Sequence, residues 1–485
     1  MYRSRLAFVL AMAALAAILL PSSLHAQVTF QRTYGGDRAD YGFSVRQTSD
    51  SGYVIAGHTL SYGLGGYDIY LVKTDVRGDT LWTRTYGDTA HDEGWSVQQT
   101  IDGGYVIAGV TNSFGVVGVD VYLIKTDANG DTLWTRTFGG TGFDVGRSVQ
   151  QTTDSGYIIA GYTESFGAGA DDVYAVKTNA SGDTQWTRTY GDSDDDYASS
   201  VQQTTDGGYI IAGGTVSPGP EGHGDVYLIR TDAEGDTLWT RTYGDSNYAF
   251  AYSVQQTTDS GYVIAGFCDG GYGDAYLIKT DASGDTQWTR TFGGASYDVA
   301  HSTQQAADGG YILTGTTLSF GSGGEDAWLM KTDSSGDTQW TRTFGDTADE
   351  GGWSICRTGD RGFIIAGYAG EWGNDRSDIY LTKTDSLGNV AVAEPKANPA
   401  RASNLTIACQ PNPATGATTI RLSPFALRHS PLTLRVYDAQ GKLALSQPVR
   451  TSSFPLSTSD LPSGAYFIRC DFAGQHATTR IVLQR

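Results

Sequence analysis

The sequence predicts an all-β protein: a seven-bladed β-propeller of four-stranded blades, followed by a small β-sandwich. Three observations predict this fold. A unit of about 52 residues recurs seven times, each unit holds four strand-like pieces separated by turn residues, and the two middle pieces are apolar on both faces. A period near 50 residues is typical of propellers and solenoids, and no helical periodicity interrupts the units.

The repeat is marked by Gly-Tyr or Gly-Phe followed by a short apolar run that ends in Gly. Its copies begin at Gly52, Gly104, Gly156, Gly208, Gly261, Gly310 and Gly362. Successive copies are 52, 52, 52, 53, 49 and 52 residues apart. Such even spacing indicates one structural unit repeated along the chain.

The second unit illustrates the four pieces, which span 95–100, 104–109, 121–125 and 132–138. The two middle pieces are apolar on both faces, so both faces must be covered. A simple sandwich would leave one face polar, whereas stacked blades cover both. The first piece is rich in Ser and Gln, which suits an inner strand beside a watery channel. The fourth is rich in Thr and Arg, which suits an outer strand.

The first strand of the mature chain is predicted to close the ring. Six units carry Trp in their fourth piece, namely Trp82, Trp134, Trp186, Trp239, Trp288 and Trp340. Residues 29–34 resemble this piece, with Phe30 at the Trp position, and residues 388–392 only begin one. We therefore expect the N-terminal strand to complete the seventh blade.

The turn before the Trp, Thr126-Asp-Ala-Asn-Gly-Asp-Thr-Leu-Trp134, resembles the tryptophan-docking repeats of quinoprotein-like propellers, although it is one residue shorter between Asp and Trp. It also loosely resembles the Asp-boxes of sialidases, and the unit length is kelch-like. Both motifs are structural in their families. The resemblance implies a propeller and says little about activity.

The N-terminal residues 1–26 have the pattern of a secretory signal peptide. Arg3 and Arg5 precede an apolar run over 6–20, which is too short for a comfortable membrane span. No other stretch is apolar enough to cross a bilayer, so we expect no transmembrane segment after signal cleavage. The predicted domains are the signal peptide 1–26, the propeller 27–392, a Pro/Ala-rich linker 393–404 and a C-terminal domain 405–485.

The formal net charge of −20 is unevenly distributed. Residues 27–392 hold 21 basic and 49 acidic residues, a net charge of −28, while the C-terminal part is basic. So acidic a body argues against nucleic-acid binding, which depends on Lys and Arg. Recurring turn and strand-entry positions hold 26 of the 49 acids, so about half of the acidity follows from blade construction. Acids that take part in binding a partner would lie among the other 23 of these 49.

Two of the four cysteines lie in the repeats and two lie in the C-terminal domain. Cys268 and Cys356 occupy non-equivalent positions in non-adjacent repeats, so we expect them to be unpaired and buried. Cys409 and Cys470 lie in the C-terminal domain, where an oxidising compartment would let them pair. No CxxC pair or Cys/His cluster has the spacing of a zinc site.

Two sets of loop residues are candidate ligand-binding groups. The loops after the fourth and second strands of each unit vary, whereas the other turns are nearly constant, and binding sites usually lie on variable loops. The first set is acidic and consists of Asp40, Asp92, Asp144, Asp196, Asp298 and Glu350. The second is aromatic and comprises Tyr62, Phe114, Phe166, Phe320 and Trp372.

Acids and aromatics at one mouth would suit a sugar or an axial cation. The alternative is that the aromatics pack the loops and the acids hold the turns. Ca²⁺ at the turn 127–131 is a weaker possibility, because the turn lacks the distal Glu and the Gly position of an EF-hand loop.

The sequence does not indicate a catalytic site. His58, His91, His223 and His301 are expected in or beside variable loops, without a partner pattern. No phosphate loop, zinc motif or Ser/His/Asp order appears. The expected function is a non-catalytic binding module for a glycan, a protein or a cation. The alternatives are a polysaccharide-acting hydrolase or lyase on the same scaffold, and a structural adhesin.

The C-terminal domain resembles the type A C-terminal sorting domain of the type IX secretion system. The resemblance rests on Gln410-Pro-Asn-Pro413, Leu432 to Gly441, Leu461 to Phe467 and the closing Arg480 to Arg485. The motif residues are Pro411, Asn412, Pro413, Gly441, Gly464 and Tyr466. The resemblance implies passage through the periplasm, handling by the type IX machinery, and release or anchoring at the surface. The alternative is an accessory sandwich that binds a ligand.

Overall fold

The structure is a computed structural model of the 485-residue chain. It describes residues 27–216, 224–244, 248–269, 273–370 and 376–390, and in the C-terminal part 406–410, 417–423, 432–438, 442–449, 453–457, 461–472 and 475–483. The expected signal peptide and linker lie outside these residues. The chain separates into two compact units, Met1–Ala391 and Val392–Arg485.

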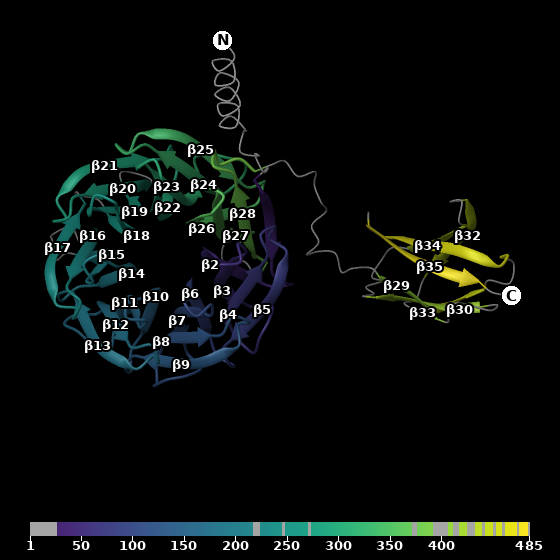
Figure 1. Ribbon diagram of the computed structural model, residues 1–485, viewed down its shortest axis with the longest axis horizontal. Coiled ribbons are helices and arrows are strands. Elements are labelled where there is room, and N and C mark those ends of the chain that lie inside the picture. The colour runs from purple at the N-terminus through teal and green to yellow at the C-terminus, as the bar shows by residue number, and fades with distance from the viewer. Residues whose placement is uncertain are drawn as a thin grey trace, which may run out of the picture. The chain divides into compact units, whose positions relative to one another are not determined.

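The first unit is a ring of seven four-stranded antiparallel sheets (Figure 1). Six of the sheets are built from four consecutive strands. The first three sheets comprise β2 (Asp40–Gln47), β3 (Tyr53–Thr59), β4 (Asp68–Thr74) and β5 (Thr80–Tyr86); β6 (Asp92–Gln99), β7 (Tyr105–Thr111), β8 (Asp120–Thr126) and β9 (Thr132–Phe138); and β10 (Asp144–Gln151), β11 (Tyr157–Thr163), β12 (Asp172–Thr178) and β13 (Thr184–Tyr190).

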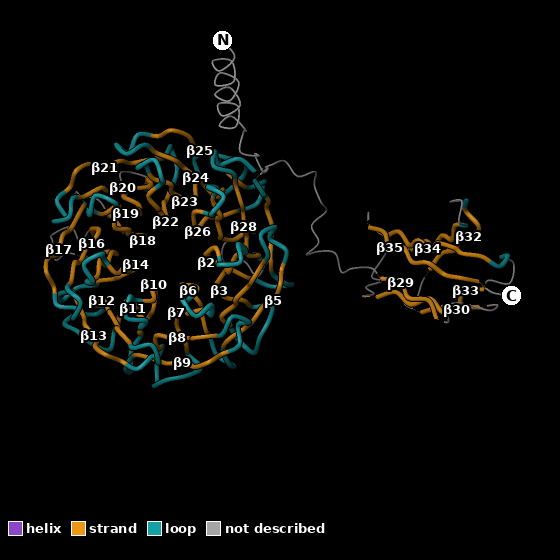
Figure 2. Tube along the Cα trace, viewed as in Figure 1, coloured by secondary structure: helices purple, strands orange, loops and turns teal. Residues whose placement is uncertain are grey.

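The next three sheets comprise β14 (Asp196–Gln203), β15 (Tyr209–Val216), β16 (Gly224–Thr231) and β17 (Thr237–Tyr243); β18 (Ala249–Gln256), β19 (Tyr262–Cys268), β20 (Asp274–Thr280) and β21 (Thr286–Phe292); and β22 (Asp298–Gln305), β23 (Tyr311–Thr317), β24 (Asp326–Thr332) and β25 (Thr338–Phe344). The described residues form strands and turns and no helix (Figure 2). This confirms the predicted all-β class, a seven-bladed propeller.

The seventh sheet joins the two ends of the repeat region. It contains β26 (Glu350–Arg357), β27 (Phe363–Ala369) and β28 (Asp378–Thr384), and its fourth strand is β1 (Phe30–Tyr34) from the start of the chain. β1 pairs with β28 from Phe30 opposite Lys383 to Tyr34 opposite Ile379. The predicted ring closure is therefore confirmed.

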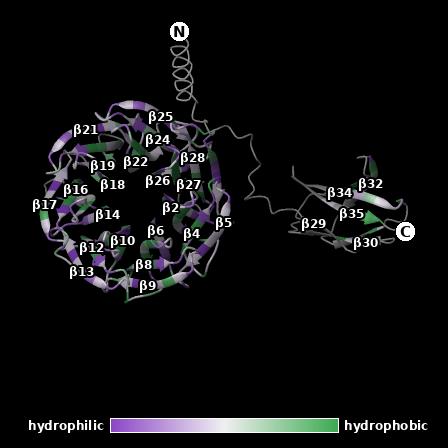
Figure 3. Ribbon diagram, viewed as in Figure 1, coloured by the Kyte–Doolittle hydropathy of each residue, from purple (hydrophilic) through white to green (hydrophobic). Residues whose placement is uncertain are grey.

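The core lies between the sheets. Both middle strands of the first sheet are buried along their whole length, because each face packs on a neighbouring sheet. One cluster combines Ile69 and Leu71 of the first sheet with Ile107 and Ile124 of the second. Hydrophilic residues recur along the outermost strands, which face solvent (Figure 3). The two-faced apolar pattern of the sequence is thus explained by blade stacking.

The outer strands also link one sheet to the next. Trp82 in β5 contacts the ring of Tyr105 edge-on and covers Gly130 in the following sheet. A Cβ on Gly130 would lie 2.8 Å from the Trp82 ring, and Gly130 has φ of +79°, so glycine is required there twice over. The Tyr86 hydroxyl donates to the carbonyl of the same glycine at 2.7 Å. The Asp-x-x-Gly turn is therefore a docking point for the preceding blade.

The second unit is a small two-sheet structure. One sheet has β29 (Thr406–Gln410), β30 (Ala417–Ser423) and β33 (Ser453–Ser457); the other has β31 (Leu432–Tyr437), β32 (Leu443–Val449), β34 (Gly464–Phe472) and β35 (Gln475–Leu483). Apolar side chains such as Ile420, Leu434 and Ile468 are buried in it. Of the motif residues, Gly464 begins β34, and the Tyr466 hydroxyl donates to the carbonyl of Pro462 at 3.1 Å. Pro411, Asn412, Pro413 and Gly441 lie outside the described residues.

Candidate functional site

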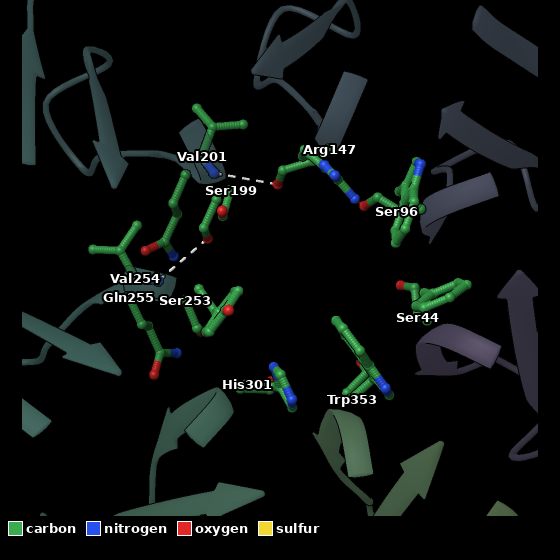
Figure 4. Close-up of a pocket in the computed structure, with 18 of the residues that line it drawn as sticks. Ser44, Ser96, Arg147, Ser199, Val201, Ser253, Val254, Gln255, His301 and Trp353 are labelled. Atoms are coloured by element: carbon green, nitrogen blue, oxygen red, sulfur yellow. Dashed lines mark hydrogen bonds between the residues drawn. The ribbon is translucent and has the colours of Figure 1, made fainter. Parts of the chain in front are cut away.

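The innermost strand of every sheet carries a β-bulge at the same place. In β2 the pairing register with β3 shifts between Gly42 and Ser44, so that Phe43 is the extra residue. A bulge re-aims the side chain that it carries. The shift recurs in all seven sheets, and every bulge residue lines the axial channel. This set, here called the bulge ring, is Phe43, Trp95, Arg147, Ser199, Tyr252, His301 and Trp353. Figure 4 labels four of them, Arg147, Ser199, His301 and Trp353.

The bulge ring varies on a constant background. Its seven positions hold six different amino acids, whereas the next residue in each inner strand is always Ser. These serines are Ser44, Ser96, Ser148, Ser200, Ser253, Ser302 and Ser354. Each one accepts a hydrogen bond from the backbone of the following sheet, for example Ser44 from the amide of Val97 at 3.2 Å. The last bond, from Val45 to Ser354 at 3.2 Å, crosses the ring closure.

Six of the seven bulge residues form a continuous chain of ring contacts around the axis. The centroid distances are 4.8 Å for Tyr252–His301, 4.0 Å for His301–Trp353, 5.2 Å for Trp353–Phe43 and 4.4 Å for Phe43–Trp95. The Arg147 Cζ atom then lies 3.9 Å from the centre of the Trp95 ring. Only Ser199, the smallest member, makes no ring contact, so the chain of rings has one opening.

The cavity widens beside that opening. It has a volume of about 570 Å³ and is lined by the bulge ring together with Tyr162, Tyr197, Ala198, Tyr248, Phe250 and Phe267. These residues come from β11, β14, the loop before β18, and strands β18 and β19. The wall near Ser199 is therefore aromatic, although Ser199 itself leaves space.

The opposite side of the same mouth is filled. His58 in β3 packs against Tyr41, Phe43 and Tyr67, with centroid distances between 4.5 and 5.3 Å. The equivalent residue in β15 is Gly214, where an added Cβ would lie 2.4 Å from the Phe250 ring. The absence of a side chain at Gly214 thus leaves room for the Phe250 ring of the next sheet, which lines the cavity.

Beneath the bulge ring the channel narrows to a second cavity of about 270 Å³. Its lining adds the serines and glutamines of the inner strands. The Gln98 side-chain carbonyl accepts from the Gln151 amide at 2.6 Å, and Gln150 accepts from Gln203 in the same way. These side chains are used in holding neighbouring blades together, as the predicted polar inner strand suggested.

The titratable groups of the bulge ring are strongly affected by burial. Burial lowers the pKa of His301 to about 3, so its imidazole is neutral at physiological pH. Its Nδ1 atom has no hydrogen-bond partner within the described residues. Burial also raises the pKa of the Tyr252 hydroxyl, which therefore stays protonated. A neutral imidazole and a phenol thus lie side by side on the cavity wall.

Arg147 is the charged member of the ring. The residue is half-buried, and its guanidinium makes no hydrogen bond or ion pair with any residue that the structure describes. The nearby Glu93 has its pKa raised by burial, and the charge of Arg147 opposes that rise. The described residues that line the two cavities include no Asp or Glu.

The six acids predicted from the sequence lie at the starts of the inner strands, where they are buried. The Asp40 carboxylate accepts hydrogen bonds from the hydroxyls of Thr59 and Ser61, the latter at 2.7 Å, and from the Gly36 amide at 2.8 Å. Similar threonine bonds occur at Asp92, Asp144 and Asp298. None of the six lines either cavity. Their contacts hold the loops together, and a role in ligand binding stays a prediction.

Glu350 differs from the other five. The residue opposite it is Ala369 rather than threonine, and the Asp346 amide donates to its carboxylate at 3.0 Å. Burial and the neighbouring acids raise its pKa to about 7. In the fifth sheet, likewise, Ala249 takes the place of Asp and faces Cys268 instead of threonine. Aspartate and threonine therefore occur as pairs, which marks these acids as part of the blade design.

The predicted aromatics are partly exposed but pack on their own blades. Tyr62 contacts Tyr70 with ring centres 5.4 Å apart, and Phe114, Phe166 and Phe320 contact the equivalent residues at 5.5 to 5.9 Å. None of these four lines the axial cavities. Trp372 lies outside the described residues. Within a blade an acid and an aromatic lie near each other, as Asp40 and Tyr62 do through Ser61, but no described member of either set lines the axial cavities.

No group of three or more His, Cys, Asp or Glu side chains is placed to hold a metal ion in the described part of the chain. In the turn proposed for Ca²⁺, the Asp127 carboxylate accepts the amides of Asn129 and Asp131 at 2.8 and 2.9 Å. These backbone bonds lower its pKa. The carboxylate thus serves the turn.

The bulge ring was missed by sequence reasoning, and His58 was misplaced, because it lies inside β3 and is buried. His301 lies just after a variable loop, as expected, but on an inner strand where burial lowers its pKa. The available signal was the alignment of the repeats. The residue directly before the constant Ser differs in nearly every unit, and that variation marks the side chain that faces the axis.

The chain's C-terminal part matches the family of secretion system C-terminal sorting domains over residues 409–484. This type IX sorting domain indicates export to the cell surface or the medium through the type IX machinery. Among the residues described, no helix is both long and apolar enough to span a bilayer.

Other comparisons are more distant. One segment is similar to the regulatory protein FlaEY of Caulobacter vibrioides, with 28% identity over 149 residues; this covers 26% of the chain and 16% of that protein. The extracellular domain of BT4673 from B. thetaiotaomicron has a TM-score of 0.41 and 13% identity, covering 93% of this chain and 60% of that one. The polysaccharide lyase Uly1 has a TM-score of 0.46 and 9% identity, covering 76% and 94%.

Proposed function

We propose that the exported propeller is a non-catalytic carbohydrate-binding module whose ligand enters the axial cavity at the bulge ring. The supporting observation is the bulge ring itself: seven side chains of six types, aimed at the axis from an otherwise constant scaffold. An aromatic cavity with a few polar groups is the usual form of a small-ligand site. Of the ligands considered from the sequence, a sugar suits stacked rings and hydroxyl partners best.

The ring geometry separates the roles of its members. Trp353 and His301 lie nearly parallel, at 12°, and form a flat wall. Tyr252 lies beside them and contributes a protonated hydroxyl. A sugar ring has apolar C–H faces and hydroxyl edges, so it would lie on the flat wall and bond to the hydroxyls. Ser199 leaves the room that such a ring needs.

Binding is tested with the mature chain and an oligosaccharide panel in isothermal titration calorimetry. Trp353→Ala and Tyr252→Ala are each expected to weaken binding at least tenfold, which corresponds to about 1.4 kcal/mol. Phe114→Ala, in a loop away from the cavity, is the matched control and should leave binding unchanged. Equal affinity in all three folded variants would contradict an axial site.

A second candidate function is a polysaccharide lyase at the same place. It is favoured by the neutral His301 beside the protonated Tyr252, since proton abstraction needs a base and departure of the leaving group needs an acid. A hydrolase is supported less, because its usual mechanism needs two carboxyl groups and none lines the described cavities. Formation of unsaturated sugar products, lost in His301→Asn and Tyr252→Phe, would establish the lyase and overturn the non-catalytic assignment.

Export is tested by deleting residues 405–485. We expect the truncated propeller to fold and to accumulate in the periplasm, because the sorting domain is missing. Surface labelling of whole cells, compared with cell fractionation, distinguishes the outcomes. Undiminished surface display of the truncated chain would exclude the sorting role.

A further inference from the structure

Arg147 is placed differently from the other arginines that lie over aromatic rings. Arg188, in the outermost strand of the same sheet, lies over Trp186 with Cζ 5.7 Å from the ring centre and contacts Asp236 at 3.2 Å. Arg147 lies closer to its tryptophan, at 3.9 Å, on the inner strand. Stacking on Trp95 thus holds the guanidinium at the cavity wall while its N–H donors have no partner in the described structure.

An arginine without a partner in an aromatic cavity is energetically unfavourable unless something else receives its hydrogen bonds. Half-burial removes part of its hydration, and a lone charge in such a site costs free energy. The next bulge residue, Ser199, likewise makes no hydrogen bond to a described residue. Two donors from neighbouring sheets, both labelled in Figure 4, thus line the wider cavity.

The same arrangement disfavours a cationic ligand. A cation would be attracted to the faces of Trp95 and Tyr162, but Arg147 already lies over both, at 3.9 and 6.0 Å. An anion meets no carboxylate among the described lining residues. A guanidinium offers paired N–H donors that fit a planar carboxylate or an oxyanion such as sulfate.

We propose that the glycan is anionic, and that Arg147, assisted by the Ser199 hydroxyl, binds a carboxylate or sulfate on its sugar ring. The neighbouring sugar face then lies on the wall formed by Tyr252, His301 and Trp353. This inference rests on the proposed axial glycan site and specifies its ligand class. It also accounts for Arg147 being the one arginine or lysine among the described residues that line the wider cavity, in a body whose net charge is −28.

The test compares matched pairs of oligosaccharides on the mature full-length chain. Oligogalacturonate and alginate oligosaccharides are titrated beside the same oligosaccharides after reduction of their carboxyl groups. A sulfated galactan oligosaccharide and its desulfated form make a third pair. The wild-type chain is expected to prefer at least one anionic probe over its neutral counterpart by about tenfold or more. Preference for the uronates or for the sulfated probe identifies the anion.

The variants are Arg147→Gln, Arg147→Lys and the matched control Arg188→Gln. Arg147→Gln should remove the anionic preference and leave the affinity for neutral probes, whereas Arg147→Lys should keep part of the preference. Arg188→Gln should change neither. Arg147→Ser is the reserve variant if Arg147→Gln fails to fold, because the next sheet already has Ser at this position.

The remaining outcomes separate the two proposals. Equal binding of neutral and anionic probes, unchanged by Arg147→Gln, would overturn the anionic ligand but leave the glycan site standing. An anionic preference that survives Arg147→Gln would overturn the role of Arg147. Binding of no oligosaccharide by the folded wild-type chain would overturn both.

Discussion

Arginine lies over tryptophan both on the outermost strands of the propeller, here called the outer wall, and on an inner strand, here called the inner wall. The two pairs differ in whether the arginine also contacts an acid. On the outer wall, Arg84 covers Trp82 and also contacts Asp131 of the next sheet at 3.2 Å. On the inner wall, Arg147 covers Trp95 and makes no ion pair with an acid that the structure describes, although Glu93 lies nearby. The outer pair is closed within the protein and joins blades, whereas the inner pair keeps its donors available.

The difference is also one of repetition. Among the residues described, the outer Arg–Trp pair occurs in six sheets, and the inner pair occurs once. A contact that every blade needs is repeated, because each blade has the same neighbour to join. A contact that occurs once is not needed to join every blade. Repeated contacts are therefore interpreted as structural, and the non-repeated contact of Arg147 as a candidate for ligand binding.

The largest effect on stability is expected from removal of β1, the outer strand that closes the ring. A chain that begins at residue 37 lacks β1, so β28 keeps only β27 as a strand partner, and it loses the buried Phe30 and Tyr34. Each of these side chains contributes on the order of 2 kcal/mol by burial. We expect the melting temperature to fall by more than about 10 °C relative to a chain that begins at residue 27. Equal melting temperatures would show that closure by β1 is dispensable.

Substitution of one tryptophan on each wall sharpens the comparison. Trp134→Ala removes the contact with Tyr157, 5.7 Å between ring centres, and should destabilise the propeller by about 3 kcal/mol. Trp353→Ala faces the cavity and should cost clearly less. Chemical denaturation of both variants measures the difference. A greater loss at Trp353 would mean that the bulge ring is chiefly structural.

Filling the opening in the bulge ring should affect binding alone. Ser199→Trp places a large side chain where two other sheets already carry one, at Trp95 and Trp353, so the fold should tolerate it. We expect ligand affinity to fall at least tenfold, about 1.4 kcal/mol, with the melting temperature nearly unchanged. Calorimetric titration and thermal melting check the two halves of this prediction, and retained affinity would place the ligand elsewhere.

The smallest effect concerns the buried acids. The pKa of Glu350 is raised to about 7 in the folded state, so the folded protein binds more protons than the unfolded chain between about pH 4.5 and 7. Its contribution therefore becomes more favourable as the pH falls from 8 towards 5. Glu350→Gln should be more stable than the wild type at pH 8 by on the order of 1 kcal/mol. This advantage should shrink at pH 5, and a constant difference across that range would contradict the raised pKa.

The fold could be predicted largely because its physics is repeated. Two-faced apolar strands demand neighbours on both sides, and seven copies with six Trp-containing outer strands left one vacancy for residues 29–34. The structure fills that vacancy with β1. The repeat pattern of the sequence therefore predicted correctly how the ring closes.

The site could not be predicted in the same way. Asp40 and its equivalents looked available because their threonine partners, such as Thr59, lie about 19 residues further along the chain. The bulge was hidden because one extra residue in each inner strand changes which side chain faces the axis. Alternation alone cannot reveal such an insertion, whereas a comparison of the repeats at Arg147, Ser199 and His301 could have done so.

The closure by β1 has a consequence for quality control. The partner of β1 is β28, which ends at Thr384, and the match to the sorting domain begins further along the chain, at residue 409. A chain that stops before β28 therefore lacks both the strand with which β1 pairs and the domain that directs export. A chain with an incomplete ring would have no sorting domain, so only complete propellers would be exported to the surface.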